Sequence, residues 1–230
     1  MKQLGLFAKY WEPGQVKTRL AASIGDLAAS SLHRVFLASS LATFQSFPAK
    51  RILSYWPPDK QSEFAKLAGP NWTLWPQQAG DLGFRMAAYF AAAANQGQKR
   101  TVLIGSDSPT LPEATVQEAF DQLKQHDVVI GPARDGGYYL IGCRGTHPDI
   151  FKEIEWGSGQ VFDQTIQRLE STSLSYALLT PWYDIDRLED LRTLHQELTD
   201  RAFPQDSNSD LVAVVDQVIS NLTIDDHSNP

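Results

Sequence analysis

The sequence predicts an α/β fold in which a mostly parallel sheet is covered by helices on both faces. Six apolar runs of strand length recur along the chain, and most of the intervals between them have the apolar periodicity of a helix. This alternation of strands and helices is typical of a parallel sheet that is buried on both sides. The 230 residues are enough for one sizeable core, so we expect one domain with a short tail.

Each predicted element has a local signal. The strands are expected in apolar runs bounded by turn residues, at 4–8, 52–56, 101–105, 128–131, 138–143 and 174–179. The helices are expected where apolar residues recur every three or four positions, at 26–44, 81–95, 112–125, 158–169 and 188–198. Asp26 and Asp81 are predicted N-caps, and Pro112 with Glu113 should open a further helix.

The C-terminal part differs in composition from the rest. We expect residues 1–200 to form the domain, and 201–230 to form a linker, a helix and a tail. Pro, Asp, Ser and Asn dominate 203–210, which predicts the linker, whereas 211–222 has enough apolar residues for one amphipathic helix. The polar residues 225–230 are expected to be disordered.

Composition narrows the classes of function. The net charge of −7 and the lack of a long basic run argue against a nucleic-acid surface or an anionic membrane face. The single cysteine, Cys143, excludes an intramolecular disulfide and a cysteine cluster for zinc, and its apolar surroundings predict a buried side chain. No apolar run reaches membrane-spanning length, so we expect a cytoplasmic protein without a membrane span.

The segment 105–109, GSDSP, places Asp107 just beyond the predicted strand 101–105. Ligands of parallel α/β sheets bind beyond the carboxyl ends of the strands. A Mg²⁺ ion takes one or two protein carboxylates and completes its shell with water and phosphates. Asp107 is therefore a candidate metal ligand, and the alternative is that it caps the turn before Ser108 and Pro109.

A basic segment follows the first strand. Lys9, Lys17 and Arg19 surround Gly14 at the start of an expected helix. Cations in a first helical turn oppose the helix dipole unless an anion lies there too, which favours phosphate binding. The spacing is not that of a Walker A loop. The alternative is a solvated helix start.

A second helix start repeats this pattern, because Arg85 falls in the first turn of the helix capped by Asp81. Arg85 is expected either to approach the same anion or to pair with Asp81.

The loop 131–139 joins two predicted strands and contains Asp135, Gly136, Gly137 and Tyr138. Adjacent glycines permit positive φ and close approach of a ligand, and Asp-Gly is equally a strong hairpin signal. A hairpin can present Asp135 and Tyr138 to an acceptor. Trp156 lies beside another polar loop, where it is a candidate for stacking on a ligand.

Asp184 and Asp186 alternate at strand spacing, so only one of them is expected to face the site. Asp186 is the candidate, with a helix cap near Leu188 as the alternative. The five histidines show no metal-binding spacing and are expected to be surface or structural residues, not metal ligands.

Read in order, five motifs resemble those of a bacterial GT-A type transferase family that is often described as associated with radical-SAM genes: FAKYWEPGQVKTRLA, QAGDLGFRM, VLIGSDSPTLP, VVIGPARDGGYYLIG and DIDRLEDL. The resemblance covers about residues 1–200. It implies a single-domain, Rossmann-like three-layer GT-A fold of the nucleotide-diphospho-sugar transferase superfamily. It also implies Mg²⁺ or Mn²⁺ held by Asp107 and Asp186. Gly105 stands where a literal DxD motif has its first acid, and Arg187 and Leu188 replace a Thr-Pro pair.

The resemblance implies a metal-dependent transferase with a nucleotide-activated donor and a small-molecule acceptor. Glycosyl transfer from a nucleotide-sugar is the first hypothesis. The alternatives are nucleotidyl transfer from a nucleoside triphosphate to a phosphorylated small molecule, and a non-catalytic nucleotide-binding module. The predicted catalytic residues are Asp107, Asp135 and Lys17. The predicted nucleotide and phosphate ligands are Lys9, Gly14, Lys17, Thr18, Arg19, Asp81, Arg85 and Ser106. The predicted acceptor residues are Asp135, Gly136, Gly137, Tyr138 and Trp156.

Overall fold

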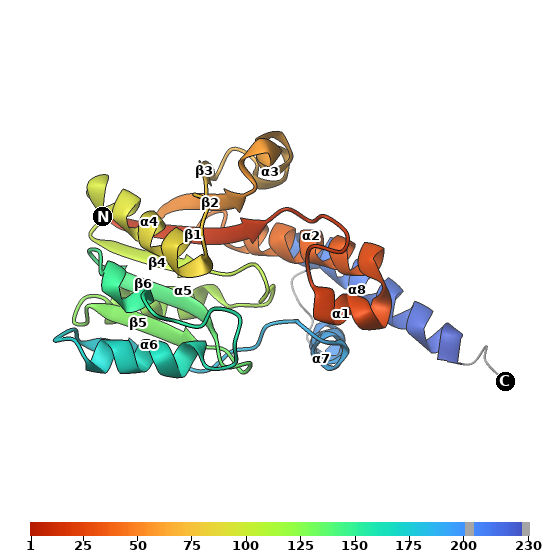
Figure 1. Cartoon of the computed structure of the whole chain (residues 1–230). Helices are drawn as coiled ribbons and strands as arrows, with labels where there is room; N and C mark the ends of the chain where they lie inside the picture. The colour runs from red at the N-terminus through yellow and green to blue at the C-terminus, as the bar shows by residue number, and fades with distance from the viewer. Residues whose placement is uncertain (201–204, 227–230) are drawn as a thin grey trace.

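The computed structural model describes residues 1–200 and 205–226, in which seven strands form one sheet of order β3-β2-β1-β4-β6-β5-β7 (Figure 1). The strand β6 is antiparallel to both of its neighbours, and all other neighbouring strands are parallel. The strands are β1 (Lys2–Lys9), β2 (Lys50–Trp56), β3 (Thr73–Pro76), β4 (Arg100–Ile104), β5 (Val128–Pro132), β6 (Tyr138–Arg144) and β7 (Tyr176–Leu178). The predicted mostly parallel sheet is therefore confirmed, and so is the hairpin that joins β5 to β6.

The helices alternate with the strands as the periodicity predicts. They are α1 (Thr18–Ile24), α2 (Asp26–Thr43), α3 (Gln61–Ala68), α4 (Leu82–Asn95), α5 (Glu113–Gln122), α6 (Val161–Glu170), α7 (Leu188–Asp200) and α8 (Gln205–Asp226), with short 3-10 turns η1 (Pro58–Lys60) and η2 (Pro148–Phe151). The five predicted helices correspond to α2 and to α4 through α7. The strand β3 was not predicted because it has only four residues.

Alternate side chains of the central strands enter two separate cores. On β4, Val102 and Ile104 pack with residues of α2, α3 and α5, whereas Leu103 packs with α4, η2 and α6. On β5, Val129 belongs to the first core, and its neighbours on the strand belong to the second. Continuous apolar runs therefore arise because both faces of the sheet are covered, which gives the three-layer arrangement.

A group of helices lies beyond the end of the sheet. The helices α1, α7 and α8 gather around α2 in Figure 1 and share a third core that includes Leu20, Phe36, Leu194 and Val215. The helix α8 begins at Gln205 and ends at Asp226, so residues 205–210, which composition assigns to a linker, are helical. The expected disorder of 225–230 is wrong at 225–226, which are also helical. The rest of that tail, 227–230, and residues 201–204 of the predicted linker region lie outside the described part of the chain.

The predicted helix caps are partly right. The Asp81 carboxylate caps α4 by accepting the backbone N–H of Phe84 at 2.7 Å. Asp26 is not an N-cap, because Gly25 has this position at φ 82° and Asp26 is the first residue of α2. Gly25 also ends α1, and its positive φ permits the sharp turn between the two helices.

Among the described residues, no helix has both the length and the apolar character needed to cross a membrane.

Cys143 is buried in the second core, as predicted, and burial raises the pKa of its thiol well above the usual range.

Candidate active site

The candidate active site lies where the carboxyl ends of β1 and β4 meet the segment that follows β7. Asp107 stands three residues beyond the end of β4, and Asp186 belongs to the segment between β7 and α7. The backbone N–H of Ile185 donates to the carbonyl oxygen of Asp107 at 3.0 Å, which fixes the two segments side by side. The two predicted metal-binding acids are thus brought together by the fold.

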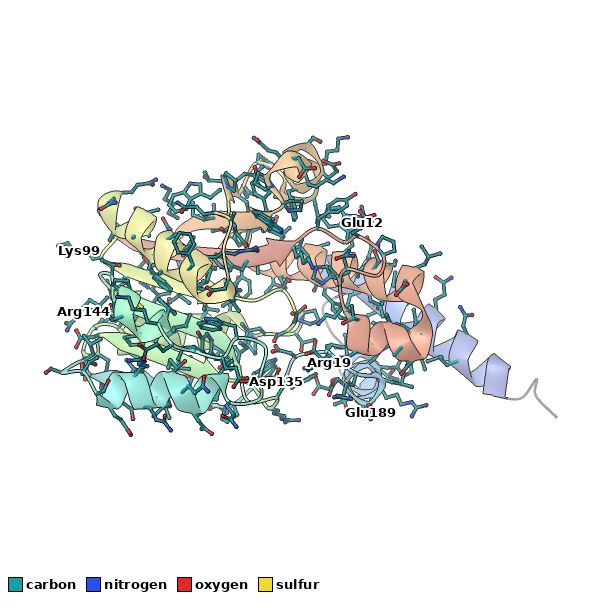
Figure 2. All side chains as sticks on the ribbon, viewed as in Figure 1. Glu12, Arg19, Lys99, Asp135, Arg144 and Glu189 are labelled. Atoms are coloured by element: carbon teal, nitrogen blue, oxygen red, sulfur yellow. The ribbon has the colours of Figure 1, made fainter. Side chains whose placement is uncertain are left out.

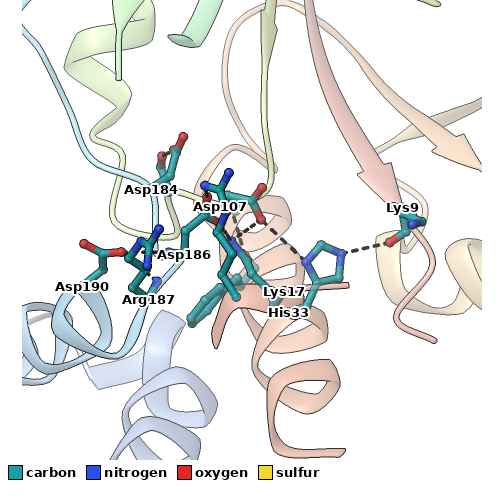
Figure 3. Close-up of polar contacts among 12 residues, drawn as sticks. Lys9, Lys17, His33, Asp107, Asp184, Asp186, Arg187 and Asp190 are labelled. Atoms are coloured by element: carbon teal, nitrogen blue, oxygen red, sulfur yellow. Dashed lines mark hydrogen bonds and ion pairs between the residues drawn. The ribbon is translucent and has the colours of Figure 1, made fainter. Parts of the chain in front are cut away.

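Lys17 lies between these two acids (Figure 3). Its Nζ is 2.7 Å from Oδ1 of Asp107 and 3.0 Å from Oδ1 of Asp186, and its side chain is only 2% exposed. Lys17 precedes α1 and has a left-handed backbone with φ 49°. Burial alone would lower the pKa of Lys17, but the two carboxylates outweigh it and raise that pKa above its usual value. The site therefore holds a buried, charged ammonium.

Asp107 faces the ammonium with one oxygen and the cavity with the rest of its carboxylate. Its Oδ1 is buried, whereas the side chain as a whole is 41% exposed. Burial opposes ionisation, but the Lys17 ammonium and the His33 ring together hold the pKa of Asp107 well below its usual range. The side chain of Asp107 is directed to Lys17 and His33, which disfavours the turn-cap interpretation.

His33 is a site residue that the sequence analysis assigned to a structural role. Its Nε2 lies 3.0 Å from the carbonyl oxygen of Lys9, and its Nδ1 lies 3.6 Å from Oδ1 of Asp107 (Figure 3). His33 sits on the buried face of α2, among Ala29, Leu32 and Phe36. The one sequence signal that could have indicated it is a polar residue on the apolar face of a predicted helix.

Both Asp184 and Asp186 line the site, so the expectation that only one faces it is wrong. The alternation rule fails because this segment is not a regular strand. Asp184 accepts the hydroxyl of Ser108 at 2.5 Å. Burial and the nearby charge of Asp107 raise the pKa of Asp184 to about 7.

The start of α7 is stabilised by Asp190 rather than by Asp186. The Asp190 carboxylate accepts the backbone N–H of Asp186 at 3.1 Å and that of Arg187 at 2.8 Å. This arrangement leaves the Asp186 side chain for Lys17 and for Arg19, whose Nη1 lies 3.7 Å from Oδ2 of Asp186. The anion that the basic helix start requires is therefore supplied, within the chain, by Asp107 and Asp186.

The other predicted cations lie around the same space. Lys9 donates its Nζ to the carbonyl oxygen of Gln15 at 2.7 Å. The guanidinium of Arg85 lies over the Trp56 ring at 4.3 Å, and its Nε donates to the carbonyl oxygen of Gly80 at 2.9 Å. The predicted alternative of a direct Arg85–Asp81 ion pair is not found, because the Asp81 carboxylate caps α4.

Two cavities adjoin at these acids. The first has a volume of about 450 Å³ and contains the cationic side chains, with Lys9, Lys17, His33, Trp56, Gln77, Arg85, Ser106 and Asp107 among its lining residues. The second, of about 560 Å³, is lined by Arg19, Asp135, Gly137, Trp156, Ser158, Arg187 and others. Both share Leu82, Tyr138, Asp184 and Asp186. Arg19 and Asp135 approach the second cavity from α1 and from the β5–β6 hairpin (Figure 2).

Residues 39–158 match a family described as "Uncharacterized protein conserved in bacteria (DUF2064)". This chain belongs to that family. A protein from Desulfovibrio desulfuricans G20, provisionally described as a nucleotide-diphospho-sugar transferase, has a crystal structure that is 35% identical in sequence. The match covers 96% of this chain and 97% of that one, with a TM-score of 0.87. The nucleotide-diphospho-sugar transferase fold implied by the resemblance is confirmed.

A curated relative is the 3-phospho-D-glycerate guanylyltransferase of Phenylobacterium zucineum (strain HLK1), 31% identical over 137 residues. The match spans 57% of this chain and 62% of the relative, less than two thirds of its length. The 4-diphosphocytidyl-2C-methyl-D-erythritol synthase of Anaerococcus prevotii DSM 20548 superposes on 86% of this chain and 96% of its own, with a TM-score of 0.58 and 11% identity. That likeness shows a shared fold.

The fold of this DUF2064 member places most predicted site residues at the two cavities, but four lie elsewhere. Gly14, Thr18, Asp81 and Gly136 are not among the lining residues. Gly136, at φ 89°, packs against the Gly159 carbonyl, and a Cβ would overlap that oxygen. The packing of the hairpin therefore requires a glycine at this position.

Asp107 and Asp186 offer two carboxylates to a divalent ion. Among residues 1–200 and 205–226, no group of three or more His, Cys, Asp or Glu side chains could hold a metal. The two carboxylates direct their Oδ1 atoms to one point, now taken by the Lys17 ammonium. Two carboxylates suit Mg²⁺ when phosphates and water complete its shell, so the residues fit a metal that arrives with a nucleotide.

Proposed function

We propose that this protein is a nucleotidyltransferase that transfers a nucleoside monophosphate unit from a nucleoside triphosphate to a phosphorylated small molecule. The observation that carries the proposal is that two cavities meet at Asp184 and Asp186, beside Asp107 and Lys17, which line the first of them. One cavity has the cations for a triphosphate, and the other has room for an acceptor. The guanylyltransferase relative supports this reading over glycosyl transfer, which was the first hypothesis.

The donor is assigned to the first cavity because its cations gather there. Lys9 approaches from the end of β1, Lys17 from the segment that follows β1, and Arg85 from α4. The Trp56 ring beside Arg85 offers an apolar wall. Preorganised cations lower the energy of the negative charge that develops on a leaving pyrophosphate.

The reaction is a displacement at phosphorus. An oxygen of the acceptor phosphate attacks the α-phosphorus of the triphosphate, and a new P–O bond forms. The bond between the α-phosphorus and the α,β-bridging oxygen breaks, and pyrophosphate leaves with that electron pair. The acceptor phosphate is largely ionised near neutral pH, so no protein group has to remove a proton.

Asp107 and Asp186 would hold a divalent ion that arrives with the phosphates of the donor. When bound, Mg²⁺ or Mn²⁺ supplies Lewis-acid stabilisation of the phosphoryl oxygens. The chain's own residues orient the reactants: Asp186 lines both cavities, Asp107 lines the first, and Lys17 holds the two carboxylates together before the donor binds.

The acceptor is assigned to the second cavity. Arg19 and Arg187 supply positive charge at its edge, and Trp156 provides a broad apolar face that also packs on Gly83 of α4. One oxygen of Asp135 accepts the backbone N–H of Gly137 at 2.9 Å and so orders the hairpin. For a phosphate acceptor, Asp135 acts as an anchor and not as a base.

Glycosyl transfer is the second candidate. The 35%-identical protein from Desulfovibrio desulfuricans G20, with its provisional description as a nucleotide-diphospho-sugar transferase, favours it. In that reaction a hydroxyl acceptor needs a general base, and Asp135 in the second cavity is placed for that role.

A binding panel separates the two candidates. Thermal unfolding is measured with nucleoside triphosphates, GTP first, and with nucleotide-sugars, each with Mg²⁺ or Mn²⁺. A ligand that binds only the native state raises the melting temperature. Selective stabilisation by a triphosphate is expected, and it should be lost in Asp107→Ala and Asp186→Ala. Selective stabilisation by a nucleotide-sugar would favour glycosyl transfer, and no response to any nucleotide would contradict both.

A further inference from the structure

The two candidate metal ligands already share a cation of the protein itself. Oδ1 of Asp107 and Oδ1 of Asp186 both lie within 3.0 Å of the Lys17 ammonium, and the Lys17 side chain is 2% exposed. A divalent ion bridging these two oxygens would have to take the place of the ammonium. Figure 3 shows Lys17 with both carboxylates, and His33 on the other side of Asp107.

We propose that Lys17 is a resident cation of the metal site, which keeps a divalent ion out until the phosphates of the donor draw the ammonium away. This inference rests on the metal assignment within the proposed function. Lys17 is then a positioning residue: it holds Asp107 and Asp186 together before the donor binds. Metal and nucleotide must consequently bind cooperatively.

Electrostatics supports the exchange. With Lys17 in place, the pair of carboxylates and the ammonium carry one net negative charge, and a divalent ion entering beside the ammonium meets like charge at close range. A triphosphate changes this balance, because it offers the ammonium new anionic partners. The same phosphates then supply the remaining oxygen ligands that the metal needs.

The structure leaves Lys17 room for this movement. Lys17 lines the 450 Å³ cavity assigned to the donor, so its ammonium can reach the phosphates without leaving the site. Each carboxylate also has a second cationic or polar neighbour that does not depend on Lys17. Nδ1 of His33 lies 3.6 Å from Oδ1 of Asp107, and Nη1 of Arg19 lies 3.7 Å from Oδ2 of Asp186. These weaker contacts hold the carboxylates in position while the cation is exchanged.

The test measures Mn²⁺ binding by electron paramagnetic resonance in metal-free protein, without any nucleotide. Lys17→Met removes the resident charge and keeps an apolar stem of similar length. We expect Lys17→Met to bind Mn²⁺ about tenfold or more tightly than wild type, because the competing ammonium is gone. Lys66→Met, at an exposed lysine of α3, is the control and should match wild type. Equal or weaker Mn²⁺ binding by folded Lys17→Met would overturn the inference.

A second comparison keeps the inference testable if Lys17→Met does not fold. In wild type, GTP should tighten Mn²⁺ binding about tenfold or more, because each ligand favours displacement of the ammonium. This factor is counted after the Mn²⁺ that free GTP binds has been subtracted. Tight, micromolar Mn²⁺ binding by wild type without GTP would overturn the inference. The Mn²⁺-only measurement involves no transfer reaction, so its result is independent of whether nucleotidyl or glycosyl transfer is correct.

Discussion

Replacing Asp184 by Asn is expected to stabilise the protein. Burial and the charge of Asp107 raise the pKa of Asp184 to about 7, against about 3.9 in an unfolded chain. Each unit of difference corresponds to about 1.4 kcal/mol, so ionised Asp184 lowers the free energy of unfolding by up to about 4 kcal/mol. Water at the partly exposed carboxyl reduces this to about 2 kcal/mol. Asn keeps an acceptor for the Ser108 hydroxyl and removes the charge.

The sign of the pH dependence is specific. Because the folded protein binds this proton more tightly, Asp184 reduces stability only as the pH rises from about 4 through about 7. The gain of Asp184→Asn should therefore be near zero at pH 4 and complete at pH 8. The assay is urea unfolding in EDTA, read as the midpoint at constant slope. An unchanged or lower midpoint at pH 8, or a gain equal at both pH values, would refute the reasoning.

Asp107→Asn is the matched substitution, and it should have the opposite effect. It takes from the buried Lys17 ammonium its nearest partner, at 2.7 Å. Loss of one partner from a buried ion pair costs about 3–5 kcal/mol, and the remaining contact to Asp186 reduces this to about 2 kcal/mol. A stabilising Asp107→Asn would show that the Lys17 contact is not a favourable one.

Three further predictions concern packing, the sheet edge and the acceptor cavity. Gly136→Ala should lower the free energy of unfolding by about 2–3 kcal/mol, because the new Cβ would overlap the Gly159 carbonyl. Gly145→Ala is the control and should cost less, because Gly145 has a similar φ of 85° but no atom near the new Cβ. Equal losses would show that the contact with Gly159 does not matter. Asp127→Asn loses ion-pair and hydrogen-bond contacts with Arg144 and Ser175, which hold the pKa of Asp127 well below its usual range. It should cost about 1–2 kcal/mol at pH 7, and the cost should diminish as the pH falls below about 4, the pKa of an unfolded aspartate, toward the lowered pKa of the folded protein, as urea midpoints at pH 7 and at about pH 3 would show. Trp156→Ala should raise the KM for the acceptor and leave the affinity for the triphosphate unchanged, and a loss of triphosphate affinity would place Trp156 at the donor instead.

The layers of the fold were predictable because their signal is repeated and local. Runs such as 101–105 and 128–131 are apolar throughout since both faces of the sheet are buried, and the Asp-Gly sequence at 135–136 marks the hairpin. Short elements without repetition, such as β3, gave no such signal. The helix α8 extends over polar residues that composition assigned to a linker, because packing on α2 outweighs local preference.

The site was predictable only in part, because its contacts join distant segments. Asp107 is predictable from its place after a strand, and Asp186 from the resemblance. The contact of Lys17 with both acids spans 90 and 169 residues of sequence, and no local pattern distinguishes a lysine that binds phosphate from one that binds carboxylates. Asp184 was excluded by an alternation rule that needs a regular strand. The position of the His33 ring beside Asp107 depends on how α2 is rotated against β1 and β4.

Transfer of label from a triphosphate tests the central claim most directly. The protein is incubated with Mg²⁺, GTP labelled at the α-phosphate and 3-phospho-D-glycerate, the acceptor named for the curated relative, along with other phosphorylated acids. Nucleotidyl transfer predicts that the label enters the acceptor and that pyrophosphate is released in equal amount, with neither product in Asp107→Ala. Release of a nucleoside diphosphate from a nucleotide-sugar, with no pyrophosphate from any triphosphate, would contradict it.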